Sequence, residues 1–288
     1  MTPSNLVYLN GRFVAPEEAC VPVMDRGFLF GDSVYEVIPA YGGHLFRFTE
    51  HLDRLDRSLD AIGMSNPLSR TDWRQIMETL LGSPAPDDDQ SIYLQVTRGV
   101  SATRDHVVPE DATPTVVAMA RPLPAMTREA RAAGLAAITL EDIRWHWCDI
   151  KTTSLLANVL GRQKAWKTGA QEAILVRDGQ ATEGAASNLF IVSNDLVITP
   201  PNSRDLLPGI TRDLILELAA GDGIPYAEAA IGTTELEQAD EIWISSSSKE
   251  VMPVVRLNGV PVGDGTAGPV WHRVYELFDA YKARLRLQ

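Results

Sequence analysis

The alternation of hydrophobic and polar residues along the chain predicts several short strands. Residues 6–14 read LVYLNGRFV, a hairpin in which Asn10 and Gly11 supply the two-residue turn. The stretch 32–41 alternates and is β-branched, so it predicts another strand, which the glycine pair after it turns back into HLFRF. The same patterns predict strands at 91–97, 115–120, 135–140, 172–177, 189–192, 196–199 and 241–245.

Hydrophobic residues at helical spacing predict five helices. In the first helix Leu52, Leu55, Leu59 and Ile62 share one face, and Thr49 stands where an N-cap residue is expected. The other helices are predicted at 71–81, at 153–168, from about Thr211 onward and at 269–285.

Strands and helices are mixed without a regular βαβ alternation, so the prediction is an α+β protein of two domains rather than one doubly wound sheet. Residues 121–134, RPLPAMTREARAAG, hold two prolines within four positions and are the linker candidate. The predicted domains are therefore 1–120 and 135–288. The long polar loop at 98–114 is a candidate functional loop.

Composition and charge limit the classes of function. Hydrophobic residues make up 45% of the 288 and charged residues 22%, the balance of a soluble globular protein. The chain has no apolar run of about 18 residues and no secretion-signal pattern at its N-terminus. Cys20 and Cys148 form neither a disulfide framework nor a metal-ligand spacing. With a net charge of −12, nucleic acid and anionic membranes are not expected partners, and a cytoplasmic location is expected.

Lysine is rare, which narrows the candidates for amine chemistry. The chain has 21 arginines but five lysines, and the first 150 residues contain no lysine. Lys151 falls between an extended apolar stretch and the start of a predicted helix, a junction that tends to be buried. Burial lowers the pKa of an amine and favours its attack on an aldehyde. Lys164, Lys167 and Lys282 are expected to be plain surface residues.

Three further segments carry candidate chemistry, each with a simpler structural interpretation beside it. Glu183, in ATEGAASNLFIV, is either a carboxylate reaching into a tight site or a turn carboxylate. Thr211 is a predicted helix N-cap, so the backbone N–H groups of Ile210 and Thr211 are a candidate phosphate cradle, next to the hydroxyl run 245–248. Arg54, in EHLDRLDRSL, is either a phosphate ligand or part of a helix-surface ion pair.

Five stretches in this order resemble the class IV (fold type IV) pyridoxal-phosphate aminotransferases, and most closely those that act on D-amino acids. They read RGFLFGDSVYEV, EHLDRL, DIKTTSLLANVL, TEGAASNLF…ITP…LLPGITR and SSSSKEV, and the similarity covers almost the whole chain. The resemblance implies a smaller N-terminal α/β domain, a larger barrel-like C-terminal domain, and Lys151 as the catalytic residue that holds pyridoxal 5′-phosphate as a Schiff base. It assigns cofactor binding to Arg54, Lys151, Glu183, Leu207, Ile210, Thr211, Ser246 and Ser247.

The resemblance also implies a substrate site. Tyr35, Arg104 and His106 look like the tyrosine, arginine and histidine that bind the substrate α-carboxylate, with the loop of the last two supplied by the partner of a homodimer. Without the resemblance, the TRDH segment is a solvated loop in which Asp105 and Glu110 pair with the arginine. The loop is one residue longer than in the relatives compared, and Asp105 places a negative charge beside the proposed carboxylate-binding residues.

Several activities share these features. The main expectation is exchange between a D-amino acid, such as D-alanine or D-glutamate, and a 2-oxo acid, such as 2-oxoglutarate. The alternatives are an L-branched-chain or (R)-amine transaminase, a 4-amino-4-deoxychorismate lyase of the same fold, and a non-catalytic cofactor-binding protein. Lys249, just after the serine run, is a further cation that would balance the charge of a cofactor phosphate.

Overall fold

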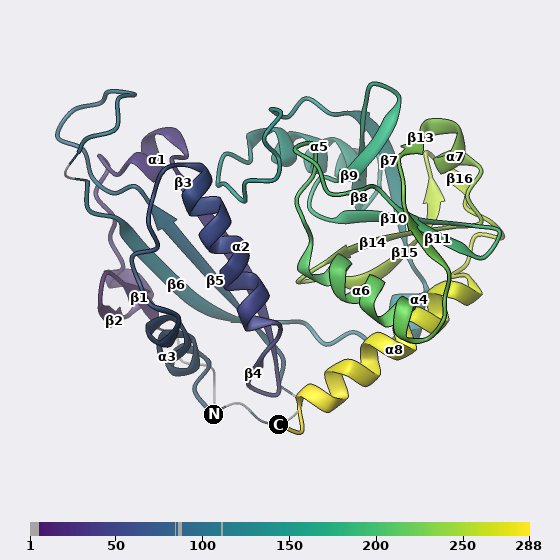
Figure 1. The fold of residues 1–288 in the computed structure, drawn as a ribbon, viewed down its shortest axis with the longest axis horizontal. Helices are drawn as coiled ribbons and strands as arrows, with labels where there is room; N and C mark the ends of the chain where they lie inside the picture. Colours follow the sequence, from purple (N-terminus) through teal and green to yellow (C-terminus); the bar gives the residue numbers. More distant parts are fainter. Residues whose placement is uncertain (1–5, 84, 86–87, 111) are drawn as a thin grey trace. The chain divides into compact units, whose positions relative to one another are not determined.

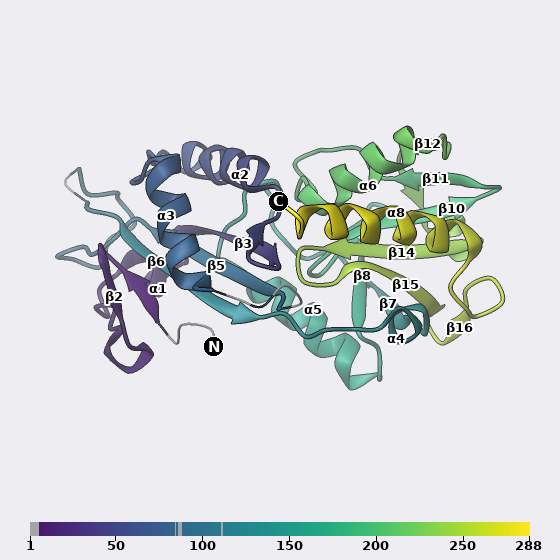
Figure 2. The ribbon, with the colours of Figure 1, turned by 90° about the horizontal axis from the view of Figure 1, so that it is seen from below.

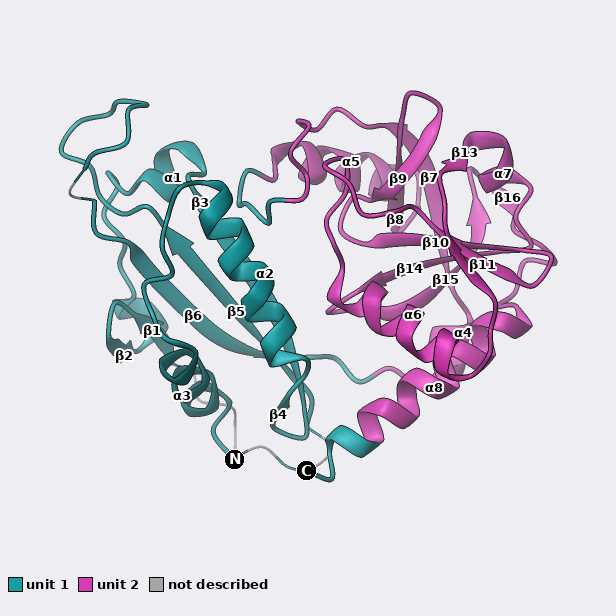
Figure 3. Cartoon of the chain, in the orientation of Figure 1, with its two compact units in different colours: residues 1–125, 150–154, 284–288 teal, residues 126–149, 155–283 magenta. Residues whose placement is uncertain are grey.

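The computed structural model describes residues 6–83, 85, 88–110 and 112–288. The chain forms two compact units (Figure 3): unit 1 comprises Met1–Ala125, Ile150–Ser154 and Arg284–Gln288, and unit 2 comprises Met126–Asp149 and Leu155–Ala283. Each unit combines a sheet with helices, so the α+β class is confirmed. The change of unit at 125/126 falls within the predicted linker, and the short segment that carries Lys151 groups with unit 1.

Unit 1 is built on a six-stranded sheet whose strands all pair antiparallel, in the order β2-β1-β6-β5-β3-β4. The predicted hairpin is confirmed, because Val7 pairs with Val14 and both turn residues, Asn10 and Gly11, have a positive φ (47° and 90°). The strands are β1 (Val7–Leu9), β2 (Arg12–Val14), β3 (Ser33–Tyr41), β4 (His44–Leu45), β5 (Gln90–Thr97) and β6 (Thr115–Pro122).

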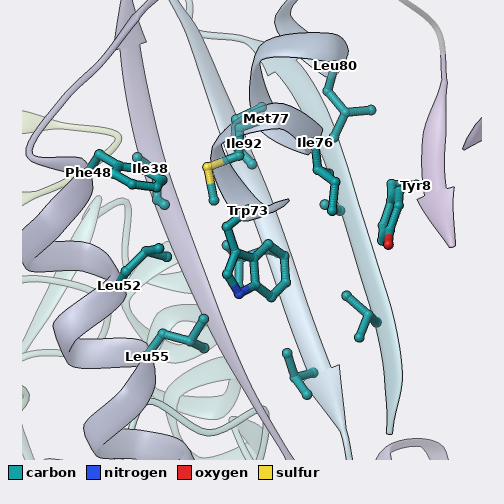
Figure 4. Close-up of a cluster of buried hydrophobic side chains, with 14 of the residues drawn as sticks. Tyr8, Ile38, Phe48, Leu52, Leu55, Trp73, Ile76, Met77, Leu80 and Ile92 are labelled. Carbon is teal, nitrogen blue, oxygen red and sulfur yellow. The ribbon is translucent and has the colours of Figure 1, made fainter. Parts of the chain in front are cut away.

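Two helices of unit 1, α2 (Phe48–Ala61) and α3 (Arg70–Leu81), lie over the same face of this sheet (Figures 1 and 2). Leu52 and Leu55 of α2 and Trp73 of α3 are fully buried and pack in one cluster with Ile38 and Ile92 of the sheet (Figure 4). Each such side chain contributes about 1.5–3 kcal/mol by leaving water. A short helix, α1 (Arg26–Phe30), and a 3-10 helix, Pro16–Glu18, complete the unit.

The predicted start of α2 at Thr49 was wrong. The N-cap residue is Arg47, in the left-handed region at φ 46°, and Phe48 is already helical and buried. This start brings the Phe48 ring into the core. By contrast, α3 begins as capping rules describe, because Ser69 and Asp72 form a capping box.

Unit 2 contains a ten-stranded mixed sheet that curls into part of a barrel (Figure 1). The order along the sheet is β12-β11-β10-β14-β15-β7-β8-β9-β13, with β16 paired to β15. The strands are β7 (Leu135–Glu141), β8 (Glu172–Arg177), β9 (Gln180–Gly184), β10 (Asn188–Ser193), β11 (Leu196–Thr199), β12 (Tyr226–Glu228), β13 (Ile231–Gly232), β14 (Glu241–Ser246), β15 (Glu250–Leu257) and β16 (Val260–Pro261).

Five helices belong wholly or mainly to unit 2. They are α4 (Arg128–Ala132), α5 (Leu156–Lys167), α6 (Ile210–Gly221), α7 (Thr233–Glu237) and α8 (Pro269–Leu285). Helix α5 packs against β7 and β8, where its Ala165 shares a small cluster with Ala173 of β8. Glu241 of β14 accepts hydrogen bonds from the backbone N–H groups of Val270 and Trp271 at the start of α8 (both 2.9 Å). None of the helices in the described part of the chain has the length and apolar character needed to cross a membrane.

The predicted N-cap at Thr211 was wrong by two residues. Gly209 is the N-cap of α6, in an extended conformation, and Ile210 opens the helix. A side chain at this position would displace the amide of Asn188, because a Cβ on Gly209 would lie 1.8 Å from Oδ1 of Asn188. The glycine therefore allows the helix start and β10 to approach closely.

Candidate functional site

Lys151 is held against β3 by main-chain hydrogen bonds. Its carbonyl oxygen accepts from the Tyr35 N–H (2.9 Å), and its own N–H donates to Oγ of Ser58 on α2 (3.1 Å). Two residues later, the N–H of Thr153 donates to the Ser33 carbonyl (3.1 Å). The half-buried side chain places Nζ 4.3 Å from the centre of the Tyr35 ring. Lys151 and Tyr35, both predicted site residues, are thus in direct contact.

Arg54 is buried, so its interpretation as a helix-surface ion pair was wrong. Its Nε and NH2 atoms donate to the two carboxylate oxygens of Glu36 on β3, at 2.7 and 2.8 Å. Nδ1 of His51, one turn earlier on α2, lies 2.8 Å from the same carboxylate. All three side chains are at most 4% exposed. Such bidentate pairing is the strongest geometry available to a guanidinium and a carboxylate.

The electrostatics of this cluster fix its charge states. Burial acts to raise the pKa of Glu36, but the charge and hydrogen bonds of Arg54, with those of His51, outweigh it and hold the pKa far below its usual value. Burial lowers the pKa of His51, with Glu36 acting in the opposite direction. His51 is therefore a neutral imidazole near pH 7 that donates its Nδ1–H to an ionised Glu36.

The sequence interpretation missed Glu36 and His51, although a signal for them exists. On β3 the residues Val34, Glu36, Ile38 and Ala40 alternate toward the core, and all four are fully buried. A charged residue in such a row requires a buried partner of opposite charge. An arginine beside the leucine face of the next helix is that partner.

Arg104 and His106 lie on the exposed loop between β5 and β6 and share one aromatic neighbour. Cζ of Arg104 is 5.1 Å from the centre of the Phe30 ring, and the His106 ring is tilted against it, also at 5.1 Å. The alternative pairing of Arg104 with Asp105 or Glu110 is not formed, since no carboxylate among the described residues lies within ion-pair distance.

Tyr35, the third predicted substrate residue, contacts a separate group of side chains. Its ring stacks on that of Tyr93 with the centres 5.8 Å apart. The Tyr93 hydroxyl donates to Gln95 (2.7 Å). Burial, with Tyr35 adding to the effect, raises the pKa of Tyr93 to about 12, so the Tyr93 hydroxyl stays protonated at neutral pH.

In unit 2, Glu183 lies within β9 and is buried, so both its placement between strands and its interpretation as a turn carboxylate were wrong. One carboxylate oxygen forms a close ion pair with NH1 of Arg144. The other accepts from the Leu207 N–H (3.2 Å) and from Nδ2 of Asn188 (3.4 Å). Arg144 also binds Asp142 at 2.8 Å, so the cation is shared between two carboxylates.

The remaining predicted cofactor residues of unit 2 gather around Asn188. Nδ2 of Asn188 also donates to the Leu207 carbonyl (2.8 Å), and Asn188 is paired across the sheet with Ser245 at the end of β14. Ile210 and Thr211 form the first turn of α6, which begins without a side-chain cap. The start of α6 and the end of β14, which carries Ser246, therefore meet at Asn188, and Ser247 follows directly after that strand end.

The other lysines fall into two groups. Nζ of Lys249 donates to the fully buried Glu172 (3.0 Å), and its part in balancing a cofactor phosphate stays a prediction. Lys282, expected at the surface, is 6% exposed and bound to Glu250 at 2.9 Å. Lys164 and Lys167 are exposed, as predicted.

Comparison with known proteins matches these features to one family. Residues 33–257 match the family described as amino-transferase class IV. The chain is 40% identical over 274 residues to D-alanine aminotransferase of Listeria monocytogenes, covering 94% of each chain. It is also similar to the solved structure of the branched-chain amino acid aminotransferase of Escherichia coli, with TM-score 0.87, 29% identity, and 96% and 93% of the two chains covered.

A second solved structure with the same fold is a hypothetical aminotransferase from Mycobacterium tuberculosis in a PLP-bound form. Its TM-score is 0.83 at 26% identity, with 96% of this chain and 98% of that chain covered. The family match spans most of the chain and includes Lys151, Glu183 and the start of α6. The chain belongs to the class IV aminotransferase family.

Proposed function

We propose that this enzyme transfers an amino group between a D-amino acid, such as D-alanine, and a 2-oxo acid, such as 2-oxoglutarate. The observation that carries the proposal is the 40% identity to a D-alanine aminotransferase over 94% of both chains. The branched-chain relatives have lower identity, 29% for the enzyme of Escherichia coli. An L-branched-chain activity is therefore the alternative that the substrate panel below must exclude.

The cofactor in this proposal is pyridoxal 5′-phosphate, and the residues present fit its chemistry. Lys151 supplies the amine for a Schiff base, and its Nζ is already placed over an aromatic ring. Glu183 is a buried carboxylate that is ion-paired with Arg144, and a carboxylate suits a protonated pyridine nitrogen. When bound, the cofactor supplies an electron sink for the negative charge that develops at Cα.

We assign the phosphate to the donors that the resemblance to the family indicates. The first turn of α6, with Ile210 and Thr211, offers backbone N–H groups at the positive end of a helix that no described side chain caps. Ser246, at the end of β14, and Ser247, directly after it, add two hydroxyls to the proposed set, and Leu207 precedes the helix. Arg54 is a permanently charged guanidinium whose Nε and NH2 atoms are already bound to Glu36.

The chain's own residues would direct the chemistry. With the cofactor bound, the amine of Lys151 would take the proton from Cα of the substrate. Tyr35 of one protomer, with Arg104 and His106 of the partner subunit, would bind the α-carboxylate, and fixing that group leaves one Cα–H pointing toward the lysine. The handedness of the substrate is then decided by where the carboxylate is held.

We also propose a homodimer in a reducing, cytoplasmic compartment. Helix α5 carries four exposed apolar side chains, Leu156, Val159, Leu160 and Trp166, with 52–72% of each exposed, and such a patch is typical of a protein interface. Both cysteines are free thiols. Sedimentation should give a dimer, and Leu160→Glu should shift it toward a monomer.

The experiment begins with the holoenzyme and borohydride. Reduction followed by peptide mass spectrometry should label Lys151, and Lys151→Ala should abolish both labelling and transamination. Lys164→Ala, at an exposed position on α5, is the matched control and should behave as wild type.

Substrate class is tested in the half-reaction with the yellow holoenzyme. D-alanine should bleach the cofactor absorption, whereas L-alanine and L-leucine should leave it unchanged. Bleaching by L-leucine instead would replace the proposed substrate class with the branched-chain one. Labelling at a lysine other than 151 would refute the proposed catalytic residue.

A further inference from the structure

The short helix α1 anchors the base of the loop that carries Arg104 and His106. Asp25 caps the helix by accepting from the Gly27 N–H (2.8 Å), and it also accepts from the hydroxyls of Thr97 (2.9 Å) and Thr115 (2.7 Å). These two threonines end β5 and begin β6, the strands that flank the loop. Asp25 is fully buried, so α1 is fixed to both ends of the loop.

Arg26, the first residue of α1, reaches across to the tip of the same loop. Its NH1 atom donates to the carbonyl oxygens of Asp105 (2.6 Å) and Val107 (3.3 Å), and NH2 donates to that of His106 (3.2 Å). Three consecutive carbonyls are thus bound by one guanidinium that is 3% exposed. The side chains of these loop residues remain exposed, so the buried arginine holds the main chain and leaves the side chains available.

The charge of Arg26 is balanced inside unit 1. Its Nε donates to Oδ2 of Asp32 (2.8 Å), and Nε of Arg98 donates to the same oxygen (2.8 Å). Burial acts to raise the pKa of Asp32, but the hydrogen bonds and charges of Arg98 and Arg26 outweigh it and lower the pKa. Asp32 therefore stays ionised and orients the plane of the Arg26 guanidinium.

Phe30 completes the support from the last position of α1. Cζ of Arg26 lies 4.9 Å from the centre of its ring. Arg104 and His106 contact the same ring, each at 5.1 Å. One aromatic ring is thereby shared by the buried cation and by both side chains assigned to the substrate carboxylate.

From these contacts we infer that Arg26 is a positioning residue for the substrate-carboxylate site. It fixes the main chain at 105–107 and, with Phe30, the directions of Arg104 and His106, and so sets the affinity for the α-carboxylate. The inference rests on the proposed function, because it takes these two side chains as carboxylate ligands. A planar arginine suits the task, since a lysine has a single charged centre and cannot span three carbonyls and a carboxylate.

The test compares two reagents that react with the cofactor aldehyde and differ in one group. Aminooxyacetate carries a carboxylate and hydroxylamine does not. In Arg26→Met, the apparent dissociation constant for aminooxyacetate and the KM for D-alanine should rise roughly ten- to 100-fold, the loss of about one charge-assisted hydrogen bond. The rate with hydroxylamine and the absorption of the bound cofactor should stay at wild-type values. Arg26→Lys should show the same selective effect, smaller in size.

Controls separate this inference from the function on which it rests. Arg12→Met, at an exposed position on β2, should leave both the affinity for aminooxyacetate and the rate with hydroxylamine unchanged. Arg104→Ala should weaken the binding of aminooxyacetate and leave the rate with hydroxylamine unchanged. An unaltered affinity of this variant for aminooxyacetate would refute Arg104 as the proposed carboxylate ligand. If Arg104→Ala has its effect while both Arg26 variants bind aminooxyacetate as wild type, the positioning role is refuted and the function stands.

Equal slowing with both reagents in the Arg26 variants would also overturn the inference, because it would show general damage to the cofactor site. If Arg26→Met yields no folded holoenzyme, Arg26→Lys decides by the same pair of reagents.

Discussion

Replacing Glu36 by glutamine tests whether the buried cluster on α2 and β3 holds unit 1 together. The substitution keeps the shape of the side chain and removes a charge that is bound by Arg54 at 2.7 and 2.8 Å and by His51 at 2.8 Å. Glutamine accepts through one oxygen only, so Arg54 loses one of its two bonds to residue 36 together with the negative charge that Glu36 places beside it. Breaking a buried ion pair from one side costs about 3–5 kcal/mol. Because glutamine retains one hydrogen bond, we expect a loss near the lower bound, about 3 kcal/mol.

The assay is urea unfolding of the cofactor-free enzyme, followed by circular dichroism. At pH 7 the free energy of unfolding of Glu36→Gln should lie about 3 kcal/mol below that of wild type. Glu78→Gln is the matched control, since Glu78 is exposed and pairs with Arg74 at 3.8 Å. A surface pair of this kind contributes at most about 1 kcal/mol, so this control should stay close to wild type.

The pH dependence of the same comparison follows from the pKa shift. In the folded protein the pKa of Glu36 lies well below its ordinary value of 4.5. The stabilisation by Glu36 is therefore complete above that value and is lost as the pH falls through it toward the folded pKa. The difference in the free energy of unfolding between wild type and Glu36→Gln should be largest near neutral pH and should decrease below about pH 4.5. If the two free energies of unfolding differ by less than about 0.5 kcal/mol at pH 7, the prediction is refuted, because the ion pair is then not a source of stability.

Two other side chains give sharp expectations. Lys282→Met removes one of the cations that face the buried Glu250 and should lower the free energy of unfolding by about 1–3 kcal/mol, whereas the exposed Lys164→Met should change it by less than about 0.5 kcal/mol. Equal effects of the two lysines in urea unfolding would contradict the buried pairing. Burial raises the pKa of Cys148 to about 11, so at pH 8 iodoacetamide should alkylate the exposed Cys20 and spare Cys148; equal labelling by mass spectrometry would contradict this.

Elements with a strong local pattern were predicted with accurate bounds. The strands β8 (Glu172–Arg177) and β11 (Leu196–Thr199) and the helix α8 (Pro269–Leu285) match their predicted ranges. The strand β15 (Glu250–Leu257) was missed because Pro253 lies within it, although it is central in the sheet. The register between β15 and β7 shifts just after this proline, between Val254 and Arg256.

The chemistry of individual residues was easier to infer from sequence than their partners. The exposed positions of Lys164 and Lys167 follow from the general preference of a lysine side chain for solvent. The burial of Lys282 does not, because its partner Glu250 is 32 positions away in the chain. Similarly, 79 positions separate Arg26 from the carbonyl of Asp105 that it binds. No local pattern specifies such a contact; it exists only once the sheet has brought the two segments together.

The imbalance between 21 arginines and five lysines acquires a physical meaning from these contacts. At the loop of unit 1, at Glu36 and at Glu183, the buried cation is an arginine: Arg26, Arg54 and Arg144, respectively. A guanidinium can bind a carboxylate and carbonyls at once and does not lose its proton, so it supports the fold without offering a nucleophile. An enzyme that depends on one reactive amine benefits when its structural cations cannot compete for an aldehyde. Lys164 and Lys167 are exposed, Lys249 and Lys282 are ion-paired to buried carboxylates, and Lys151, beside an aromatic ring, stays the amine that we propose for the reaction.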